Sequence, residues 1–193
     1  LLAVGNTDWT ETGRKNLENL SDTFSCEILQ LNLNKNAARI IAKKSFEDMG
    51  QPTWYMDSLI YAYPYNMAMK LGLKLLVYGE NITYAYGGKF KTETPSAMLQ
   101  PFNDVVKTYP DEWLGVSGLS EKDLQSTIPP SVEDCKKSDL EPIYLSYFVP
   151  WDSHHNYQVA KRWGFQHLSH EYIREGSIEQ YNQIDSISYL LNL

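Results

Sequence analysis

The sequence has few of the residues that build disulfide scaffolds or membrane spans. Only two cysteines occur among its 193 residues, Cys26 and Cys135, and they lie far apart and outside any Cys-x-x-Cys spacing. This argues against a disulfide framework and against a zinc knuckle. No apolar run approaches the roughly 18 to 20 residues that cross a bilayer. These absences predict a protein of the reducing cytoplasm without a membrane segment.

Positive charge is also in short supply. Lys and Arg number 17 against 24 Asp and Glu, which gives a net charge of −7 at pH 7. Binding to nucleic acid without sequence preference relies on clustered Lys and Arg that displace counterions from phosphates. We therefore expect small molecules or proteins as partners, and no nucleic acid. The motifs GxxxxGK[ST], GxGxxG, GxSxG and CxxC are absent as well.

Segments with the patterns of strands and helices alternate along most of the chain. Strands are expected at residues 1–4, 26–33, 73–78 and 143–149. Helices are expected after a cap at Thr10, from Asn34 or Asn36 to Gly50, over 54–71 with a kink or division at Pro64, over 156–163, and from 177 to the end. The alternation predicts an α/β fold. The near-continuous apolar character of 73–78 is typical of a strand covered on both faces in a parallel sheet.

Residues 80–141 interrupt this rhythm and are interpreted as an insertion. They contain scattered Pro, Gly and aromatic residues and two short capped helices, at 120–123 and 131–134. The length suits one core with such an insertion, so a single domain is expected over residues 1–193. The sequence begins inside a predicted strand and stops inside an apolar helical pattern. We therefore expect a domain that is incomplete at both ends.

Chemistry is expected beyond the carboxyl ends of the strands, where the ligand crevice of an open parallel sheet lies. That rule selects residues 5–8, 79–81 and 150–156. Strand 73–78 delivers Glu80 and Asn81 to this edge, where a carboxylate can meet a metal, an amine or a proton. Gly79 lets the backbone approach a ligand closely. The alternative is that Glu80 only caps the next turn.

The other candidates in these segments have equally ordinary alternatives. Asn6 and Asp8 could bind a ribose or an adenine edge, or could simply form a turn. His154 and His155 are adjacent and diverge by roughly 100° in a helix, so a shared metal is not expected. One of them could donate a proton or contact a phosphate. Asp57, within an aromatic helical segment, is a further acid to follow.

Five blocks of the sequence resemble one family. They are VGNTDWTETGRKNLENL (4–20), GQPTWYMDSLIYAYPYNMA (50–68), KLLVYGENITYAYGG (74–88), IYLSYFVPWDSHHNYQVAKRWGF (143–165) and HEYIREGSIEQYNQIDSISYLLN (170–192). Together they resemble the N-acetyl sugar amidotransferases of bacterial surface-polysaccharide biosynthesis, such as O-antigen and lipopolysaccharide biosynthesis, over nearly the whole chain. The resemblance implies a fold of the ATP pyrophosphatase group, in which a doubly wound parallel sheet resembles that of adenine nucleotide hydrolases.

The resemblance also implies a reaction. With ATP and Mg²⁺, the carbonyl oxygen of an N-acetyl group on a nucleotide-linked sugar is activated as an adenylyl imidate, and pyrophosphate leaves. Ammonia, supplied by glutaminase and cyclase-like partner subunits, then replaces AMP and leaves an acetamidino group. Activation is needed because an amide oxygen is a poor leaving group. The family's pyrophosphate loop, SGGKDS, is absent here, so ATP hydrolysis is expected of a longer protein and not of these residues alone.

Particular residues take roles from the same resemblance. Catalytic roles are expected for Glu80, Asn81, Asp152 and His155. Contacts to ATP are expected from Gly5, Asn6, Asp8 and Gly79. Contacts to the sugar nucleotide are expected from Tyr84, Tyr86, Trp151 and Arg174. No metal-binding cysteines stand at 53–57, where some relatives are expected to carry them, so no resident metal is expected there.

Two other functions remain open at this stage. The chain could be a non-catalytic module that docks a glutaminase complex. It could also be another ATP pyrophosphatase, such as a tRNA-thiolation enzyme, although the acidic charge and the lack of paired cysteines argue against that alternative.

Overall fold

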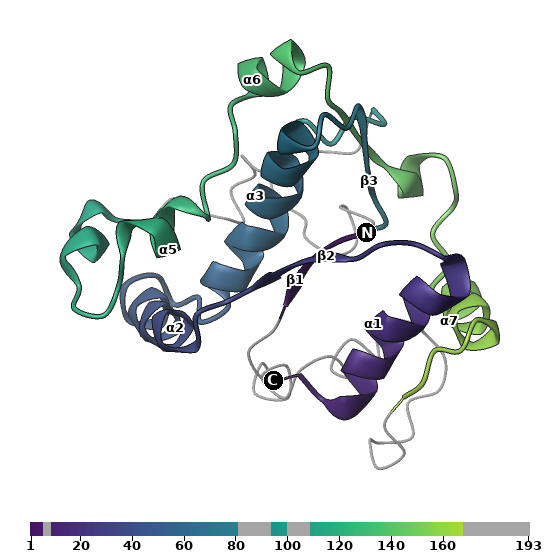
Figure 1. Cartoon of the computed structure of the whole chain (residues 1–193), viewed down its shortest axis with the longest axis horizontal. Helices are drawn as coiled ribbons and strands as arrows, with labels where there is room; N and C mark the ends of the chain where they lie inside the picture. The colour runs from purple at the N-terminus through teal and green to yellow at the C-terminus, as the bar shows by residue number, and fades with distance from the viewer. Residues whose placement is uncertain (6–8, 81–93, 100–108, 168–193) are drawn as a thin grey trace. The chain divides into compact units, whose positions relative to one another are not determined.

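The computed structural model describes residues 1–5, 9–80, 94–99 and 109–167 (Figure 1). The chain forms two compact units. The first consists of Leu1, Gly5–Asn32 and Trp151–Leu193, and the second of Leu2–Val4 and Leu33–Pro150. Each unit is described by itself.

The first unit contains α1 (Glu11–Phe24), β2 (Leu29–Asn32) and α7 (Ser153–Arg162). Helix α1 begins where predicted, because Thr10 Oγ1 accepts a hydrogen bond from Gly13 N at 2.9 Å. Of strand β1 (Leu2–Gly5), only Gly5 belongs to this unit. The Leu1 amino group donates to Glu27 O at 2.7 Å, and Leu29 N donates to Leu1 O at 2.9 Å. This stagger is the hydrogen-bond pattern of parallel strands.

The turn after α7 is fixed to α1 by side-chain amides. Asn16 Nδ2 donates to Gln166 O, and Gln166 N donates back to Asn16 Oδ1, both at 2.9 Å. Asn19 Nδ2 donates to Trp163 O at 2.6 Å. The Trp163 ring also packs against Phe24, with ring centroids 5.2 Å apart. Because these bonds involve main-chain groups at the end of α7, they satisfy a helix terminus as well as joining two helices.

Two helices of the second unit follow β2 in the chain, α2 (Lys35–Met49) and α3 (Trp54–Lys70). Asn34 caps α2, since its Oδ1 accepts from Asn36 N and Ala37 N at 3.0 and 3.4 Å. Gly50 ends α2 in the left-handed conformation, with φ of 70°. Helix α3 continues across Pro64, so of the two predicted outcomes, a kink or a division, the division does not occur.

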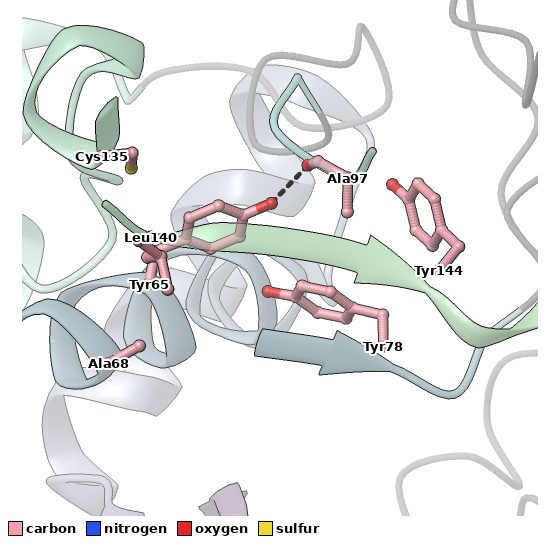
Figure 2. Packing of buried hydrophobic residues seen from close by; sticks show 7 residues of the cluster. All are labelled: Tyr65, Ala68, Tyr78, Ala97, Cys135, Leu140 and Tyr144. Atoms are coloured by element: carbon pink, nitrogen blue, oxygen red, sulfur yellow. Dashed lines mark hydrogen bonds between the residues drawn. The ribbon is translucent and has the colours of Figure 1, made fainter. Parts of the chain in front are cut away.

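Strands β3 (Leu75–Tyr78) and β4 (Glu141–Tyr144) are parallel, and the last pair in their register is Tyr78 with Tyr144. Their inner side packs against α3, with ring centroids 5.9 Å apart for Tyr65 and Tyr78 and 6.1 Å apart for Tyr78 and Tyr144. The Tyr65 hydroxyl donates to Ala97 O (Figure 2). The buried cluster shown there consists of Tyr65, Ala68, Tyr78, Ala97, Cys135, Leu140 and Tyr144.

The predicted insertion contributes to this core. Its two short helices are confirmed as α5 (Glu121–Gln125), capped by Ser120, and α6 (Val132–Lys137), capped by Ser131. A further 3₁₀ helix, η2 (Asp111–Gly115), was not predicted. Its Trp113 is buried and donates from Nε1 to Asp48 Oδ2 at 2.8 Å, which ties η2 to α2.

Several predicted boundaries differ from the structure. Strand β4 ends at Tyr144, and the rest of the predicted strand begins instead with the 3₁₀ helix η3 (Leu145–Tyr147). Helix α7 begins at Ser153, three residues before the predicted start. The helix expected from residue 177 onwards lies outside the described residues.

The exposure of some apolar side chains also differs from expectation. Phe46, a large apolar side chain of α2, is 63% exposed. Leu75 and Val77 are 55% and 47% exposed, so the expectation that both faces of β3 are covered is wrong for the described residues. The chain thus has a mixed α/β structure with short parallel strands. No helix in the described part of the chain is long and apolar enough to cross a membrane.

Candidate functional site

The candidate site in the second unit lies where β3 and β4 end. Their ladder closes at the pair Tyr78–Tyr144, and the chain of β3 continues through exposed Gly79 to half-buried Glu80. Ser146, two residues beyond the end of β4, donates from Oγ to Glu80 O at 3.0 Å. The predicted position of Glu80 at the carboxyl edge of a parallel pair is therefore confirmed. This is the edge at which open α/β sheets bind ligands.

The electrostatic environment of Glu80 favours its neutral form. Burial raises the pKa of the Glu80 carboxyl above its ordinary value, and a hydrogen bond with its own backbone opposes this only in part. None of the ion pairs among the described residues involves Glu80. A cation or an amine beside this carboxyl would lower its pKa and restore its charge. A carboxyl of this kind suits proton transfer or cation binding.

There is open space beside the same strand end. A Cβ built on Gly79 would meet no atom within 4 Å among the residues that the structure describes. On the β4 side, the main chain turns at Leu145, whose carbonyl accepts from Phe148 N and Val149 N, both at 3.0 Å. Tyr147 and Phe148 are 49% and 58% exposed, and their rings meet edge to face with centroids 5.3 Å apart. The contact shown between this turn and Glu80 is the hydrogen bond from Ser146 Oγ to Glu80 O.

The candidates at 151–155 belong to the first unit. Asp152 is the N-cap of α7, and its Oδ1 accepts from His155 N at 2.9 Å. Asp152 therefore has a structural role as a helix cap, which the sequence analysis did not predict. His155 is exposed, and Trp151 is half-buried. His154 has a ring nitrogen 2.7 Å from Gln158 Nε2, an i, i+4 contact along the same helix.

Gly5 is buried at the end of β1 beneath side-chain amides of β2. A Cβ at this position would lie 2.3 Å from Gln30 Nε2 and 3.0 Å from Asn32 Oδ1. Gln30 Nε2 in turn donates to Asn32 Oδ1 at 2.9 Å. The side-chain amides of Gln30 and Asn32 therefore occupy the space that a side chain at residue 5 would need. These two amides are the polar groups at this strand end. No motif in the sequence marks these two residues.

Several predicted site residues lie outside the described residues. They are Asn6, Asp8, Asn81, Tyr84, Tyr86 and Arg174. Of the remaining candidates, Gly79 and Glu80 belong to the second unit, and Gly5, Trp151, Asp152 and His155 to the first. Within the ranges that the structure covers, no group of three or more His, Cys, Asp and Glu side chains could hold a metal ion.

Two further residues bear on the chemistry of the second unit. Asp57, in the first turn of α3, accepts a hydrogen bond from Thr53 Oγ1 at 2.8 Å, and burial raises the pKa of its carboxyl. This contact lies within one helix turn, so Asp57 serves the start of α3. Ser146 was missed by the sequence analysis. Its only signal is its place two residues beyond a strand end, which becomes informative once the register of β3 and β4 is known.

Comparison with known proteins gives no assignment for this chain. No protein-family model matches the sequence, and no curated protein matches it either.

Proposed function

We propose that the protein is an ATP-dependent amidotransferase that converts the N-acetyl group of a nucleotide-linked sugar to an acetamidino group, with release of AMP and pyrophosphate. The doubly wound ATP pyrophosphatase fold, a cytoplasmic location and ammonia-supplying partner subunits belong to the same proposal. Two kinds of support exist. One is the resemblance of five sequence blocks. The other, which carries the proposal in the structure, is the half-buried Glu80 carboxyl at the carboxyl end of a parallel strand.

The residues at this strand end fit a magnesium nucleotide. Mg²⁺ is usually held by one or two carboxylates together with substrate phosphates and waters, so a cluster of three acids is not required. Burial raises the pKa of the Glu80 carboxyl, and no ion pair among the described residues compensates its charge. A divalent cation would supply that compensation. When bound, it would neutralise charge on the phosphates during transfer.

The chain's own residues have separate tasks in this proposal. The Glu80 carboxyl either holds the cation or orients ammonia towards the activated carbon. Gly79 leaves space for phosphate oxygens next to the main chain, because a Cβ there would meet no atom of the described residues within 4 Å.

The test is a product analysis with the full-length protein. The protein is incubated with ATP, Mg²⁺, ammonium and a uridine-diphosphate-linked N-acetyl sugar, and nucleotides and phosphates are separated by chromatography. The proposal predicts AMP and pyrophosphate in amounts equal to the amidino sugar formed. ADP and orthophosphate, or no nucleotide consumption, would contradict it. Glu80→Gln then separates the two tasks of Glu80. If the variant no longer releases pyrophosphate even when ammonia is left out of the assay, the carboxyl is needed to hold the cation.

A further inference from the structure

We propose that Ser146 is a positioning residue, whose hydroxyl fixes the main chain of Glu80 and thereby the direction of the Glu80 carboxyl. The inference rests on the proposed function, since it gives Glu80 a reaction to serve. Ser146 follows the end of β4 and has no chemical role of its own in the proposed amidotransferase reaction.

The register of the two strands brings these residues to the same edge of the parallel pair. Tyr78 pairs with Tyr144, and Glu80 and Ser146 each follow two residues later, Ser146 within the 3₁₀ helix η3. The main-chain pairing of β3 with β4 has ended before these residues. The 3.0 Å bond from Ser146 Oγ to Glu80 O joins the two segments that follow the strands.

The main chain at Glu80 needs such an anchor. Gly79 immediately precedes it, is exposed, and has no side chain that could pack. Glycine has more backbone freedom than any other residue, so the direction in which the chain leaves β3 is weakly determined by local structure. A catalytic carboxyl must be held to within about 0.5 Å, and a displacement of roughly 1 Å can cost about 100-fold in rate. The hydroxyl of Ser146 is the described group that restricts this exit.

The kinetic test compares three single variants in the full-length protein. Ser146→Ala removes the hydroxyl and is expected to lower kcat roughly 10- to 100-fold, while KM for ATP and for the sugar nucleotide changes less than about twofold. Ser146→Thr keeps a hydroxyl and is expected to stay within about threefold of the wild type. Ser138→Ala is the matched control. Ser138 Oγ donates to Cys135 O at 2.8 Å at the end of α6, so its loss also removes one serine-to-carbonyl bond and should leave kcat unchanged.

A second measurement does not depend on activity. Hydrogen exchange, followed by mass spectrometry on the peptide that carries Gly79 and Glu80, should be faster in Ser146→Ala and unchanged in Ser138→Ala. Unchanged exchange in that peptide overturns the proposal, and so does a wild-type kcat in Ser146→Ala. Wild-type protein that releases no pyrophosphate contradicts the amidotransferase function instead. The exchange comparison then decides by itself whether Ser146 fixes Glu80.

Discussion

Glu80 combines a position that suits catalysis with an environment that penalises its charge. Burial raises the pKa of its carboxyl, so the folded protein binds a proton there more tightly than the unfolded chain does. The stability from this group is therefore complete below its ordinary pKa of 4.5 and is lost as the pH rises through the raised value.

A trade-off between stability and activity is therefore predicted for Glu80→Gln. The amide is neutral at every pH, so the variant should melt at a higher temperature than the wild type near pH 7, and the difference should shrink towards pH 4. Formation of the amidino sugar should fall by about 100-fold or more, since either task of Glu80 needs its carboxylate. Melting curves from pH 4 to 8 and the product analysis provide the measurements. A variant that is less stable and fully active would contradict the account.

Asp57→Asn is the matched control for that experiment. Burial also raises the pKa of the Asp57 carboxyl, so its contribution to stability likewise declines above about pH 3.8, the ordinary value. Asn can still accept the hydrogen bond from Thr53 Oγ1, which lies 2.8 Å from Asp57 Oδ2. The variant should flatten the same part of the pH–stability curve without a loss of activity. Loss of activity would place Asp57 in the reaction.

At the residue scale, the sequence predicted the location of a residue where its position relative to a strand determines that location. Glu80 follows an apolar strand, and a parallel sheet collects such residues at one edge. Ser146 could not be found in this way, because serine is common near turns and its partner is a main-chain carbonyl 66 positions away. For Asp152, the sequence analysis expected a catalytic role and did not foresee its role as a helix cap. An acid before a helix is first a candidate cap, and its Oδ1 indeed accepts from His155 N.

At the scale of elements, one asparagine supplies two of the hydrogen bonds that join α1 to the turn after α7. Asn16 makes two hydrogen bonds to the main chain of Gln166. Asn16→Ala removes both and is expected to lower the free energy of unfolding by about 1–2 kcal/mol, since these bonds are exposed and each contributes about 0.5–1.5 kcal/mol. Urea unfolding measures the change.

Asn16→Asp separates the two bonds of that junction. Aspartate still accepts from Gln166 N but cannot donate to Gln166 O, and it faces that carbonyl with a negative charge. We expect it to recover little of the stability that Asn16→Ala loses. If neither variant changes the unfolding midpoint, the two Asn16 bonds contribute nothing to the stability of the first unit.

Helices were easier to predict than strands because caps mark their ends. Thr10, Asn34, Ser120 and Ser131 each cap a helix through a side-chain oxygen, and a cap is visible in sequence. The end of β4 is set by its pairing with β3, which stops at Tyr144. The apolar run that follows reads as a strand, yet it turns back on the carbonyl of Leu145. Periodicity alone does not distinguish these outcomes.

At the scale of the whole molecule, alternation of strands and helices predicted the α/β class, and the parallel pairing of β3 with β4 agrees with it. The long apolar character of residues 73–78 predicted cover on both faces, but Leu75 and Val77 are exposed. The hydrophobicity of a strand shows which side chains would be stable when buried. Whether they are buried depends on which other segments pack against the strand. The expected insertion is likewise part of the core, because Cys135 and Leu140 pack with the residues of β3 and β4.

The central claim is that the N-acetyl oxygen is transferred to the AMP that leaves. A sugar nucleotide labelled with ¹⁸O in its N-acetyl carbonyl, incubated with the full-length protein, ATP and ammonium, tests this most directly by mass spectrometry of the products. Activation of that oxygen by an adenylyl group predicts one ¹⁸O atom in each AMP and none in pyrophosphate. Label that stays in the sugar, or that enters orthophosphate, would contradict the account.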